Sequence, residues 1–347
     1  MSLILGIETS CDETAAAVVA DGHVIRSNVV HSQIELHQRW RGVVPEVASR
    51  SHTERILPIV RAALERAVVL PEDLTAIAVT HRPGMIGCLL VGLAAAKALA
   101  WRFGLPLVGV DHVQAHVHTG LLVEPDLPLP CLSLVASGGH TALYLLHEPG
   151  RSERLGTTRD DAAGEALDKA AALLGLPYPG GPAIQQAARG GDPRRFDLPR
   201  TLLDAESLDF SFSGLKTALL YTLRPQGAPE RAAPPTGDEL RDLACSYQEA
   251  IVDVLIKKLR RAAERHPVRS LCIGGGVARN ERLRDRLRSD RVLSALHLVL
   301  PAPDLCSDNG AMIAGRGAIR LRRGEVADLS LDALATPQAG GKAKVVR

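Results

Sequence analysis

The chain of 347 residues is 46% hydrophobic and 23% charged, which is typical of a soluble globular protein with room for two domains. Its formal net charge of +2 and its 3% aromatic content exclude a broadly basic surface and rows of stacking platforms for single-stranded nucleic acid. No apolar run reaches the roughly 18 residues of a membrane span, and the N-terminus lacks the basic segment of a signal peptide. We therefore expect no association with a membrane. The six cysteines form no CxxC pair, which indicates a reducing, cytoplasmic setting.

The first half of the chain alternates between apolar strands and amphipathic helices. Asp21-Gly22 stands between two apolar runs, which is a strong signal for a β-hairpin. After Pro45 the apolar residues recur near helical spacing, whereas short apolar runs bounded by polar residues indicate strands. These patterns predict strands at residues 3–7, 15–20, 23–30, 76–80 and 107–110, and helices at 45–66, 87–101 and from 112 onward.

The second half repeats this opening, because a strand, a polar turn and a returning strand occur at its head as well. Duplication of this kind predicts two lobes of similar topology around a cleft. We expect one lobe over 1–130, a second over 131–308, a terminal helix over 309–330 that packs back on the first lobe, and a flexible tail over 331–347. Further patterns predict strands at 132–136, 141–146 and 270–273, helices at 161–174, 244–266 and 309–323, and a surface loop at 225–237.

Three polar turns follow apolar strands, at residues 8–14, 137–140 and 274–280. A turn rich in Gly, Ser or Thr at the end of a strand leaves backbone N–H groups available to phosphate oxygens. None of the three fits the G-x-x-x-x-G-K-[ST] or the G-x-G-x-x-G pattern. Together they predict a nucleotide cleft of another kind.

His112 and His116 stand four residues apart, which on a helix places both imidazoles on one face, within reach of one metal ion. In metalloprotease helices of the H-E-x-x-H type the residue after the first histidine is the general base, and here it is Val113. The pair therefore indicates a metal and argues against proteolysis. Asp308, just before a predicted helix, is the best candidate for a third ligand, although an acid at that place can equally be an N-cap. Imidazole and carboxylate ligands suit iron, zinc and other divalent metals.

A set of collinear motifs carries a family resemblance. They are GIETSCDETAAAVV at the N-terminus, VVPEVASRSH at 43–52, DHVQAH at 111–116, SGGHT at 137–141, DDAAGEALDKAA at 160–171, YPGGPAI at 178–184, FSFSGLKTA at 210–218, GGGVARN at 274–280 and CSDNGAMIA at 306–314. With these motifs the chain resembles the bacterial tRNA adenosine threonylcarbamoyltransferases, the TsaD family, over most of its length.

The resemblance implies the bilobed α/β fold shared by actin, DnaK-type chaperones and sugar kinases. It implies transfer of a threonylcarbamoyl group from threonylcarbamoyl-adenylate to N6 of adenosine 37 in tRNAs that read codons beginning with A, with release of AMP. It also implies a divalent metal, Fe²⁺ or alternatively Zn²⁺, and two partners, a TsaB-like paralogue and a TsaE-like ATPase. By the same match the metal ligands are His112, His116 and Asp308, and the adenylate is held by Val135, Ala136, Ser137, Gly138, Gly139, Asp168, Gly181 and Asn280.

Asp12 and Glu13 are candidates for removing a proton from the adenine amine or for orienting tRNA, and each can equally be a solvated acid in a turn. Two residues depart from the family pattern: Arg82 replaces the first glycine of a Gly-Pro-Gly turn, and Gly310 stands where alanine is common. The competing functions are a carbamoyltransferase or an ATPase of the same fold that acts on another substrate, and a non-catalytic scaffold. A metalloendopeptidase is disfavoured by Val113.

Overall fold

The computed structural model describes residues 1–201, 206–224 and 234–335, and its contacts divide the chain into two compact units. Unit 1 comprises Met1–His37, Val43–Pro125 and the chain from Asp308 onward, and unit 2 comprises Gln38–Gly42 and Asp126–Ser307. Each unit is built on one five-stranded sheet.

The sheet of unit 1 has the strand order β3-β2-β1-β4-β5. Its first three strands form an antiparallel meander, and β1, β4 and β5 run parallel to one another. Asp21 and Gly22 both have positive φ in the turn between β2 and β3, which confirms the predicted hairpin. The strands are β1 Leu3–Glu8, β2 Glu13–Ala20, β3 Val24–Ser32, β4 Ala76–Arg82 and β5 Leu107–Asp111.

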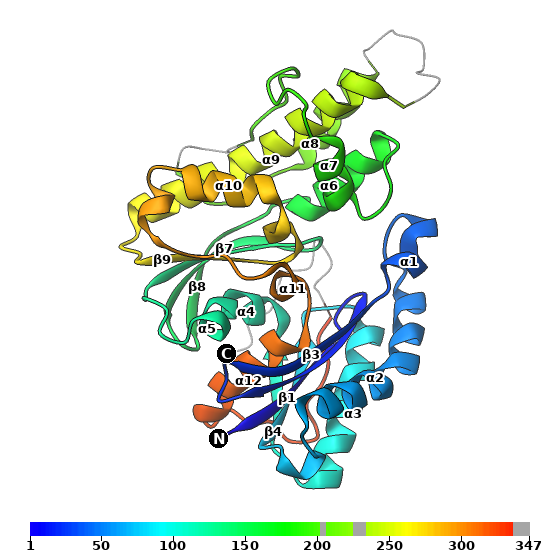
Figure 1. Ribbon diagram of the computed structural model, residues 1–347, viewed down its shortest axis with the longest axis vertical. Coiled ribbons are helices and arrows are strands. Elements are labelled where there is room, and N and C mark those ends of the chain that lie inside the picture. Colours follow the sequence, from blue (N-terminus) through cyan, green and yellow to red (C-terminus); the bar gives the residue numbers. More distant parts are fainter. Residues whose placement is uncertain (202–205, 225–233, 336–347) are drawn as a thin grey trace. The chain divides into compact units, whose positions relative to one another are not determined.

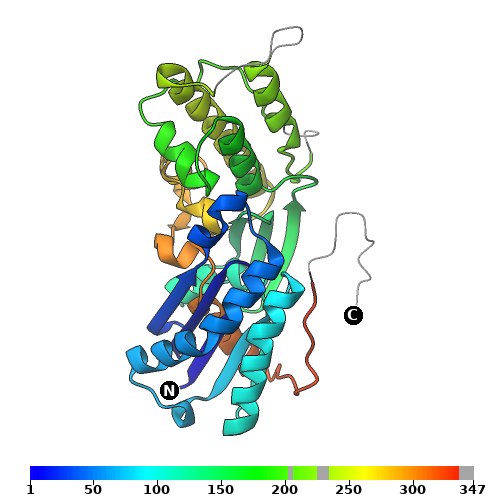
Figure 2. The same cartoon turned by 90° about the vertical axis from the view of Figure 1, so that its right-hand side faces the viewer.

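Helices cover both faces of this sheet (Figures 1 and 2). The helices α2 and α3 pack side by side on the face that receives Leu5 and Ile7 of β1, and α12 packs on the other face. Because both faces are covered, β1, β2, β4 and β5 are buried along nearly their whole length, whereas the edge strand β3 is partly exposed. The helices of unit 1 are α1 Ile34–His37, α2 Pro45–Ala67, α3 Ile86–Phe103, α4 His112–Val117, α5 Thr119–Val123 and α12 Gly310–Arg322, with the 3-10 helix η2 Pro71–Asp73.

Two glycines allow α12 to lie close to the sheet. A Cβ at Gly6 would lie 2.2 Å from the carbonyl oxygen of Gly310, and a Cβ at Gly310 would lie 2.5 Å from the backbone nitrogen of Ala17. Gly310 therefore has a packing role in this chain, which outweighs its low helix propensity. The predicted terminal helix is confirmed, and it packs back on β1, β2, β4 and β5.

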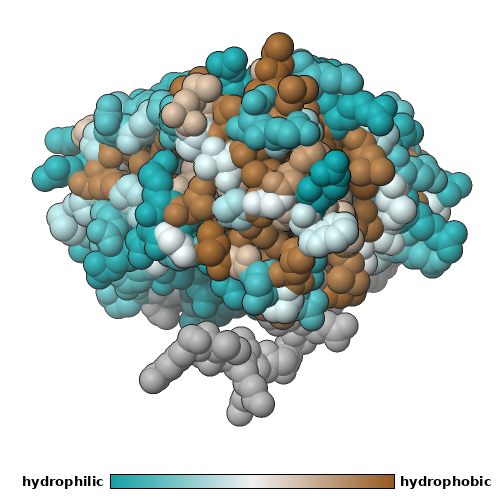
Figure 3. Space-filling model, turned by 90° about the horizontal axis from the view of Figure 1, so that it is seen from below, coloured by the Kyte–Doolittle hydropathy of each residue, from teal (hydrophilic) through white to brown (hydrophobic). Residues whose placement is uncertain are grey.

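In the described part of the chain, α3 is the one helix long and apolar enough to cross a membrane by length and composition alone. Its residues Leu89, Leu93 and Ala96 are buried in the core of unit 1, which is the arrangement of a core helix. Ile86 and Leu90 on the same helix are about half exposed, at 47% and 48%. Apolar side chains also gather on the face of unit 1 that is seen from below in Figure 3.

Unit 2 repeats the topology of unit 1, with the strand order β10-β9-β6-β7-β8. Here β6, β7 and β8 form the antiparallel meander, and β6, β9 and β10 run parallel. The repeat confirms the predicted α/β fold class with two units of like topology. The strands are β6 Cys131–Ala136, β7 Thr141–Glu148, β8 Arg151–Thr157, β9 Ser270–Gly274 and β10 His297–Val299.

The long helix α9 packs against α7 and α10 on one side of this sheet (Figure 1). It begins at Gly237, earlier than the predicted residue 244, because acidic Asp238 and Glu239 suit the first turn of a helix. Strand β8 was not predicted, because its charged sequence RSERLGT shows no apolar run. It lies at the half-exposed edge of the sheet. The helices are α6 Ala163–Leu173, α7 Gly180–Ala187, α8 Ser213–Leu223, α9 Gly237–Arg265, α10 Glu281–Ser289 and α11 Pro303–Cys306, with the 3-10 helices η1 Gln38–Trp40, η3 Gly276–Arg279 and η4 Leu293–Ala295.

Two predicted irregular segments, the surface loop at 225–237 and the tail at 331–347, fall partly outside the described residues. The parts outside are positions 225–233 of the loop and positions 336–347 of the tail. All six cysteines are free thiols, as their spacing predicted.

Candidate functional site

Three parallel strands of unit 1 bring together the residues of a candidate metal centre. Strands β1, β4 and β5 end at the same edge of the sheet, which is the usual place for ligand sites in open α/β sheets. Glu8 ends β1, and Asp111 ends β5 directly before His112. The Asp111 carboxylate accepts a hydrogen bond from the N–H of Gln114 at 3.1 Å and so caps α4, the helix that carries both histidines.

The three predicted metal ligands meet at this edge. Nε2 of His116 lies 3.0 Å from Oδ1 of Asp308, and Nε2 of His112 lies 3.5 Å from the same oxygen. One ligand atom from each residue lies within 4.8 Å of the other two. Asp308 is not the N-cap of α12, because Asn309 takes that place and accepts a hydrogen bond from the N–H of Met312 at 3.0 Å. The carboxylate of Asp308 is thus turned to the histidines.

This donor set fits a divalent metal. Two imidazole nitrogens and a carboxylate oxygen converge on one point, and three protein ligands leave positions open for water or substrate. The side chains are well shielded, with exposed fractions of 6% for His112, 1% for His116 and 17% for Asp308. Within the described residues, this is the one group of three or more potential ligand side chains.

Glu8 is a buried neighbour of the candidate metal centre that sequence reasoning missed. Its Oε2 lies 3.0 Å from Nδ1 of His112 and accepts a hydrogen bond from the Thr80 hydroxyl at 2.5 Å. Its Oε1 accepts the N–H of Ser10 at 2.5 Å, and the residue is fully buried. A carboxylate on one imidazole nitrogen fixes the ring and its proton so that the other nitrogen faces a metal. The sequence signal that could have pointed to Glu8 was an acidic residue at the end of the otherwise apolar strand β1.

The buried charges shift one another's pKa values. Burial acts to lower the pKa of His112, but the carboxylates of Asp308 and Glu8 outweigh it and raise that pKa to about 9. Burial acts to raise the pKa of Glu8, yet His112 and its hydrogen bond bring it below the ordinary value. Burial together with the carboxylates of Asp12 and Asp308 raises the pKa of Glu13 well above its usual range.

Asp12 lies in the turn between β1 and β2, and Glu13 is the first residue of β2, beside this centre. The carbonyl of Asp12 accepts the N–H of Gln33 at 3.0 Å, which fixes the turn to the end of β3. Glu13 is half-buried, and the Ser32 hydroxyl donates to it at 3.4 Å. A carboxyl group whose pKa is raised in this way holds a proton more strongly than an ordinary solvated acid does.

Arg82, the departure in the family's Gly-Pro-Gly turn, forms an ion pair. Its Nε lies 3.2 Å from Oδ2 of Asp111, so the carboxylate that caps α4 also holds Arg82. The rest of the turn packs closely, because a Cβ at Gly84 would lie 2.8 Å from the carbonyl oxygen of Ser10. The N–H of Met85 donates to that oxygen at 3.0 Å. The substitution is therefore accommodated at the rim while the turn stays anchored to the segment that follows β1.

Two of the three predicted phosphate-type turns adjoin each other in unit 2. They follow β6 and β9, which are parallel neighbours with Val135 opposite Gly274. Gly275 has a φ of 86°, and a Cβ there would lie 2.3 Å from the carbonyl oxygen of Ala136, so the second turn packs directly on the first. A Cβ at Gly138 or Gly139 would meet no atom within 4 Å. The backbone of this turn is therefore accessible.

The other predicted adenylate-binding residues of unit 2 have structural contacts of their own. The N–H of Ser137 donates to the carbonyl of His140 at 2.7 Å, which closes the SGGH turn. Asp168 accepts the N–H of Gly180 at 2.6 Å, next to Gly181 at the start of α7. Asn280 caps α10 by accepting the N–H of Leu283 at 3.0 Å, and its amide donates to Gln248 at 2.8 Å. The side chains of two further residues are buried, which leaves only their backbone to a ligand: Val135 and Ala136.

Comparison with known sequences identifies the family. Residues 24–315 match the family described as TsaD, tRNA N6-adenosine threonylcarbamoyltransferase. The chain belongs to this family. A member from Anaeromyxobacter dehalogenans is 52% identical over 334 residues, which cover 96% of this chain and 98% of the relative. The enzyme of the same name from Moorella thermoacetica is 49% identical over 333 residues, or 95% of both chains.

Solved structures of low sequence identity share the fold. HypF from T. kodakarensis has a TM-score of 0.58 at 17% identity, covering 93% of this chain and 48% of that one. Component A of (R)-2-hydroxyglutaryl-CoA dehydratase from Acidaminococcus fermentans has a TM-score of 0.54 at 12% identity, covering 93% and 100%. These similarities support the two-lobed α/β fold class and nothing further.

Proposed function

We propose that the chain transfers the threonylcarbamoyl group of threonylcarbamoyl-adenylate to N6 of adenosine 37 in tRNAs that read codons beginning with A, forming t6A and releasing AMP. Its family makes it a tRNA N6-adenosine threonylcarbamoyltransferase. The observation that supports the chemistry best is the convergence of His112, His116 and Asp308 at the ends of parallel strands, in a chain that matches its relatives over nearly its whole length.

We assign the metal to Nε2 of His112, Nε2 of His116 and the carboxylate of Asp308, with Fe²⁺ as the expected ion and Zn²⁺ as the alternative. When bound, the ion supplies positive charge that polarises the oxygens of the acyl group. Glu8 keeps a proton on Nδ1 of His112 and so holds Nε2 ready as a ligand. Thr80 and Ser10 in turn fix Glu8.

The transfer forms a bond from N6 of adenosine to the carbamoyl carbon and breaks the bond from that carbon to the phosphate oxygen of AMP. One proton leaves N6, and we assign its acceptance to Glu13, which stands at the start of β2 near Asp308. Asp12, in the turn directly before Glu13, would accept this proton in place of Glu13 or orient the tRNA. Because an exocyclic amine is a weak nucleophile, much of the rate must come from its positioning.

For unit 2 we propose adenylate binding by the SGGH turn and its neighbours. The accessible backbone at Gly138 and Gly139 suits a phosphate, since N–H groups of a glycine turn can point at its oxygens. Asp168, Gly181 and Asn280 complete this set. Asn280 and Asp168 would act while also holding α10 and α7 in place.

The proposed setting is the cytoplasm, with tRNA as macromolecular substrate and with a TsaB-like paralogue and a TsaE-like ATPase as partners. One surface of unit 1 suits a protein partner. Leu57 on α2 is 64% exposed, and on the adjacent α3 the exposed fractions are 48% for Leu90 and 76% for Trp101. Apolar side chains at this exposure mark a candidate contact surface.

The decisive experiment reconstitutes the reaction. The purified chain and its partners are given threonylcarbamoyl-adenylate and unmodified tRNA, and t6A is measured by mass spectrometry of digested tRNA. We expect t6A with the native chain and a loss of at least about 100-fold with His112→Ala, because removing a ligand removes the metal. Undiminished product with His112→Ala would exclude the assigned role of the metal.

A further inference from the structure

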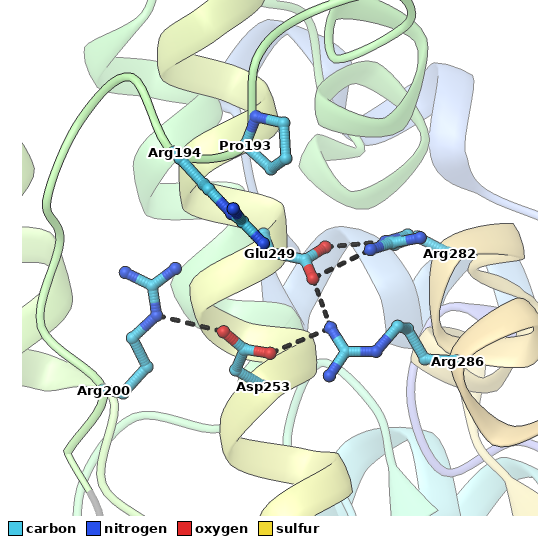
Figure 4. A pocket seen from close by; sticks show the side chains of 7 residues that line it. All are labelled: Pro193, Arg194, Arg200, Glu249, Asp253, Arg282 and Arg286. Carbon is cyan, nitrogen blue, oxygen red and sulfur yellow. Dashed lines mark hydrogen bonds and ion pairs between the residues drawn. The ribbon is translucent and has the colours of Figure 1, made fainter. Parts of the chain in front are cut away.

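A cavity of about 370 Å³ lies in unit 2 and shares no residue with the site described above. Four arginines and two acids line it, together with Pro193 (Figure 4). The arginines come from two places: Arg194 and Arg200 follow α7, and Arg282 and Arg286 stand on successive turns of α10. The acids, Glu249 and Asp253, stand on successive turns of α9. By count the cavity wall carries a net charge of +2, from four guanidinium groups and two carboxylates.

The two carboxylates hold three of the arginines in fixed positions. Glu249 accepts hydrogen bonds from Nε and Nη2 of Arg282, at 2.6 and 2.9 Å, and from Nη1 of Arg286. Asp253 accepts from Nη1 of Arg286 at 2.9 Å and from Nε of Arg200 at 3.2 Å. Charge-assisted bonds of this kind are directional, so they present the remaining N–H groups in a set geometry.

Other donors of the lining arginines are left over. Among the described residues, the side chain of Arg194 has no hydrogen bond or ion pair, and Nη2 of Arg200 and of Arg286 have none either. Figure 4 shows the Arg194 side chain extending into the group formed by the two acids and the other arginines. An arginine that no carboxylate neutralises, beside two arginines with spare N–H groups, is a site for a strongly charged anion.

We propose that this Arg-lined cavity binds backbone phosphates of the tRNA substrate; the inference rests on the proposed function and adds a place on unit 2 where that RNA is held. Guanidinium forks match phosphate oxygens in shape and charge, and they contribute phosphate contacts without reading sequence. With a net charge of only +2, the chain must draw its attraction for RNA from local clusters of this kind. The same segment adds Arg189 and Arg195, both exposed, next to Arg194.

The test compares two neighbouring arginines. Arg194→Ala removes an unpaired lining residue, and Arg195→Ala removes an exposed arginine that does not line the cavity. Binding of unmodified tRNA to the full chain is measured by fluorescence anisotropy from low to moderate NaCl. We expect Arg194→Ala to weaken binding roughly three- to tenfold at low salt and to reduce the slope of log K against log salt by about 1. Arg195→Ala should change both quantities less.

Three outcomes would overturn the proposal: unchanged affinity and slope for Arg194→Ala, an equal loss for Arg195→Ala, or tRNA binding that is intact while binding to a protein partner is lost. A separate arm titrates AMP and inorganic phosphate. If these bind in an Arg194-dependent way while tRNA binding does not depend on Arg194, the cavity is a small-anion site and the proposal fails. Arg200→Gln, with its melting temperature recorded, provides a second lining variant.

Failure of this inference and failure of the proposed function can be told apart by steady-state kinetics. If the reaction is as proposed and the cavity holds RNA, Arg194→Ala raises KM for tRNA with little change in kcat. If only the cavity inference is wrong, native chain and Arg194→Ala produce t6A with the same KM. If the proposed function is wrong, the native chain itself produces none.

Discussion

Oε2 of Glu8 lies 3.0 Å from Nδ1 of His112, and both side chains are buried. The two residues are 104 positions apart in sequence and meet because β1 and β5 end at the same edge of one sheet, with β4 between them. The pair decides which histidine nitrogen is offered to a metal, and it places negative charge behind that ligand.

Glu8→Gln should weaken metal binding without abolishing it. The amide keeps the size of the side chain but loses the negative charge that holds His112, and loss of such outer partners typically costs about 10- to 100-fold in metal affinity. Competition of Zn²⁺ between the protein and a chelator of known affinity measures the change. Thr53→Val serves as the control, because Thr53 is exposed on α2 and its hydroxyl donates to the carbonyl of Ser49 within its own helix. Equal affinity for Glu8→Gln and the native chain would contradict the role given to Glu8.

Metal affinity should rise with pH. His112 must bind a metal through a neutral nitrogen, and its pKa of about 9 in the metal-free protein means that it carries an extra proton at neutral pH. Binding therefore releases that proton, and the dissociation constant should fall about tenfold for each pH unit up to about 9. Chelator competition at a series of pH values, corrected for the chelator's own protonation, gives the slope. A flat profile between pH 6.5 and 8.5 would show that His112 is already neutral.

Asp308→Ala should affect metal binding and Asn309→Ala should affect stability, although the two residues are adjacent. The first removes a ligand, so metal binding should be lost with little change in the melting temperature of the metal-free protein. The second removes the N-cap of α12, so the free energy of unfolding should fall by about 1 kcal/mol while metal still binds. Thermal melts with and without Zn²⁺ separate the two results. Loss of metal binding in Asn309→Ala alone would reverse the assignment.

Asp160→Ala should lower the free energy of unfolding at neutral pH. The gap in stability between this variant and the native chain should close as the pH falls into the acid range. Asp160 accepts bonds from the Ser211 hydroxyl at 2.5 Å, the N–H of Phe212 at 2.8 Å and the Ser213 hydroxyl at 2.8 Å, so it fixes the start of α8. Burial acts to raise its pKa, but these bonds lower it below the ordinary value. A depressed folded-state pKa stabilises the fold above the ordinary pKa of about 4 and loses that contribution as the pH falls through the folded value.

We expect Asp160→Ala to lower the free energy of unfolding by about 1–2 kcal/mol at pH 7, since an exposed capping carboxylate is partly screened by water. Urea titrations at pH 7 and near pH 3 measure the effect. Asp197→Ala, an exposed acid of unit 2, is the matched control and should be nearly neutral at both pH values. A deficit of the same size at both pH values would mean that the Asp160 charge is irrelevant.

Much of the fold could be predicted because its signals are local. The Asp21-Gly22 turn and the apolar runs on either side specify a hairpin within a few residues, and an apolar strand, a polar turn and a returning strand at 132–146 predicted another. The helix that carries His112 and His116 follows in the same way from their four-residue spacing. Where the signal weakens, prediction failed: β8 is a charged, half-exposed edge strand, and a single sequence gives it no clear period.

The sequence by itself determined that two imidazoles share one helix face, because helical geometry is fixed by a backbone repeat of a few residues. It did not determine what faces them. Whether Asp308 or Asn309 caps α12, whether Glu8 holds His112, and why Gly310 is tolerated all depend on atoms brought together from distant parts of the chain by sheet and helix packing. Only the tertiary structure sets those distances. They matter because the energy of a buried carboxylate depends on every charge and donor around it.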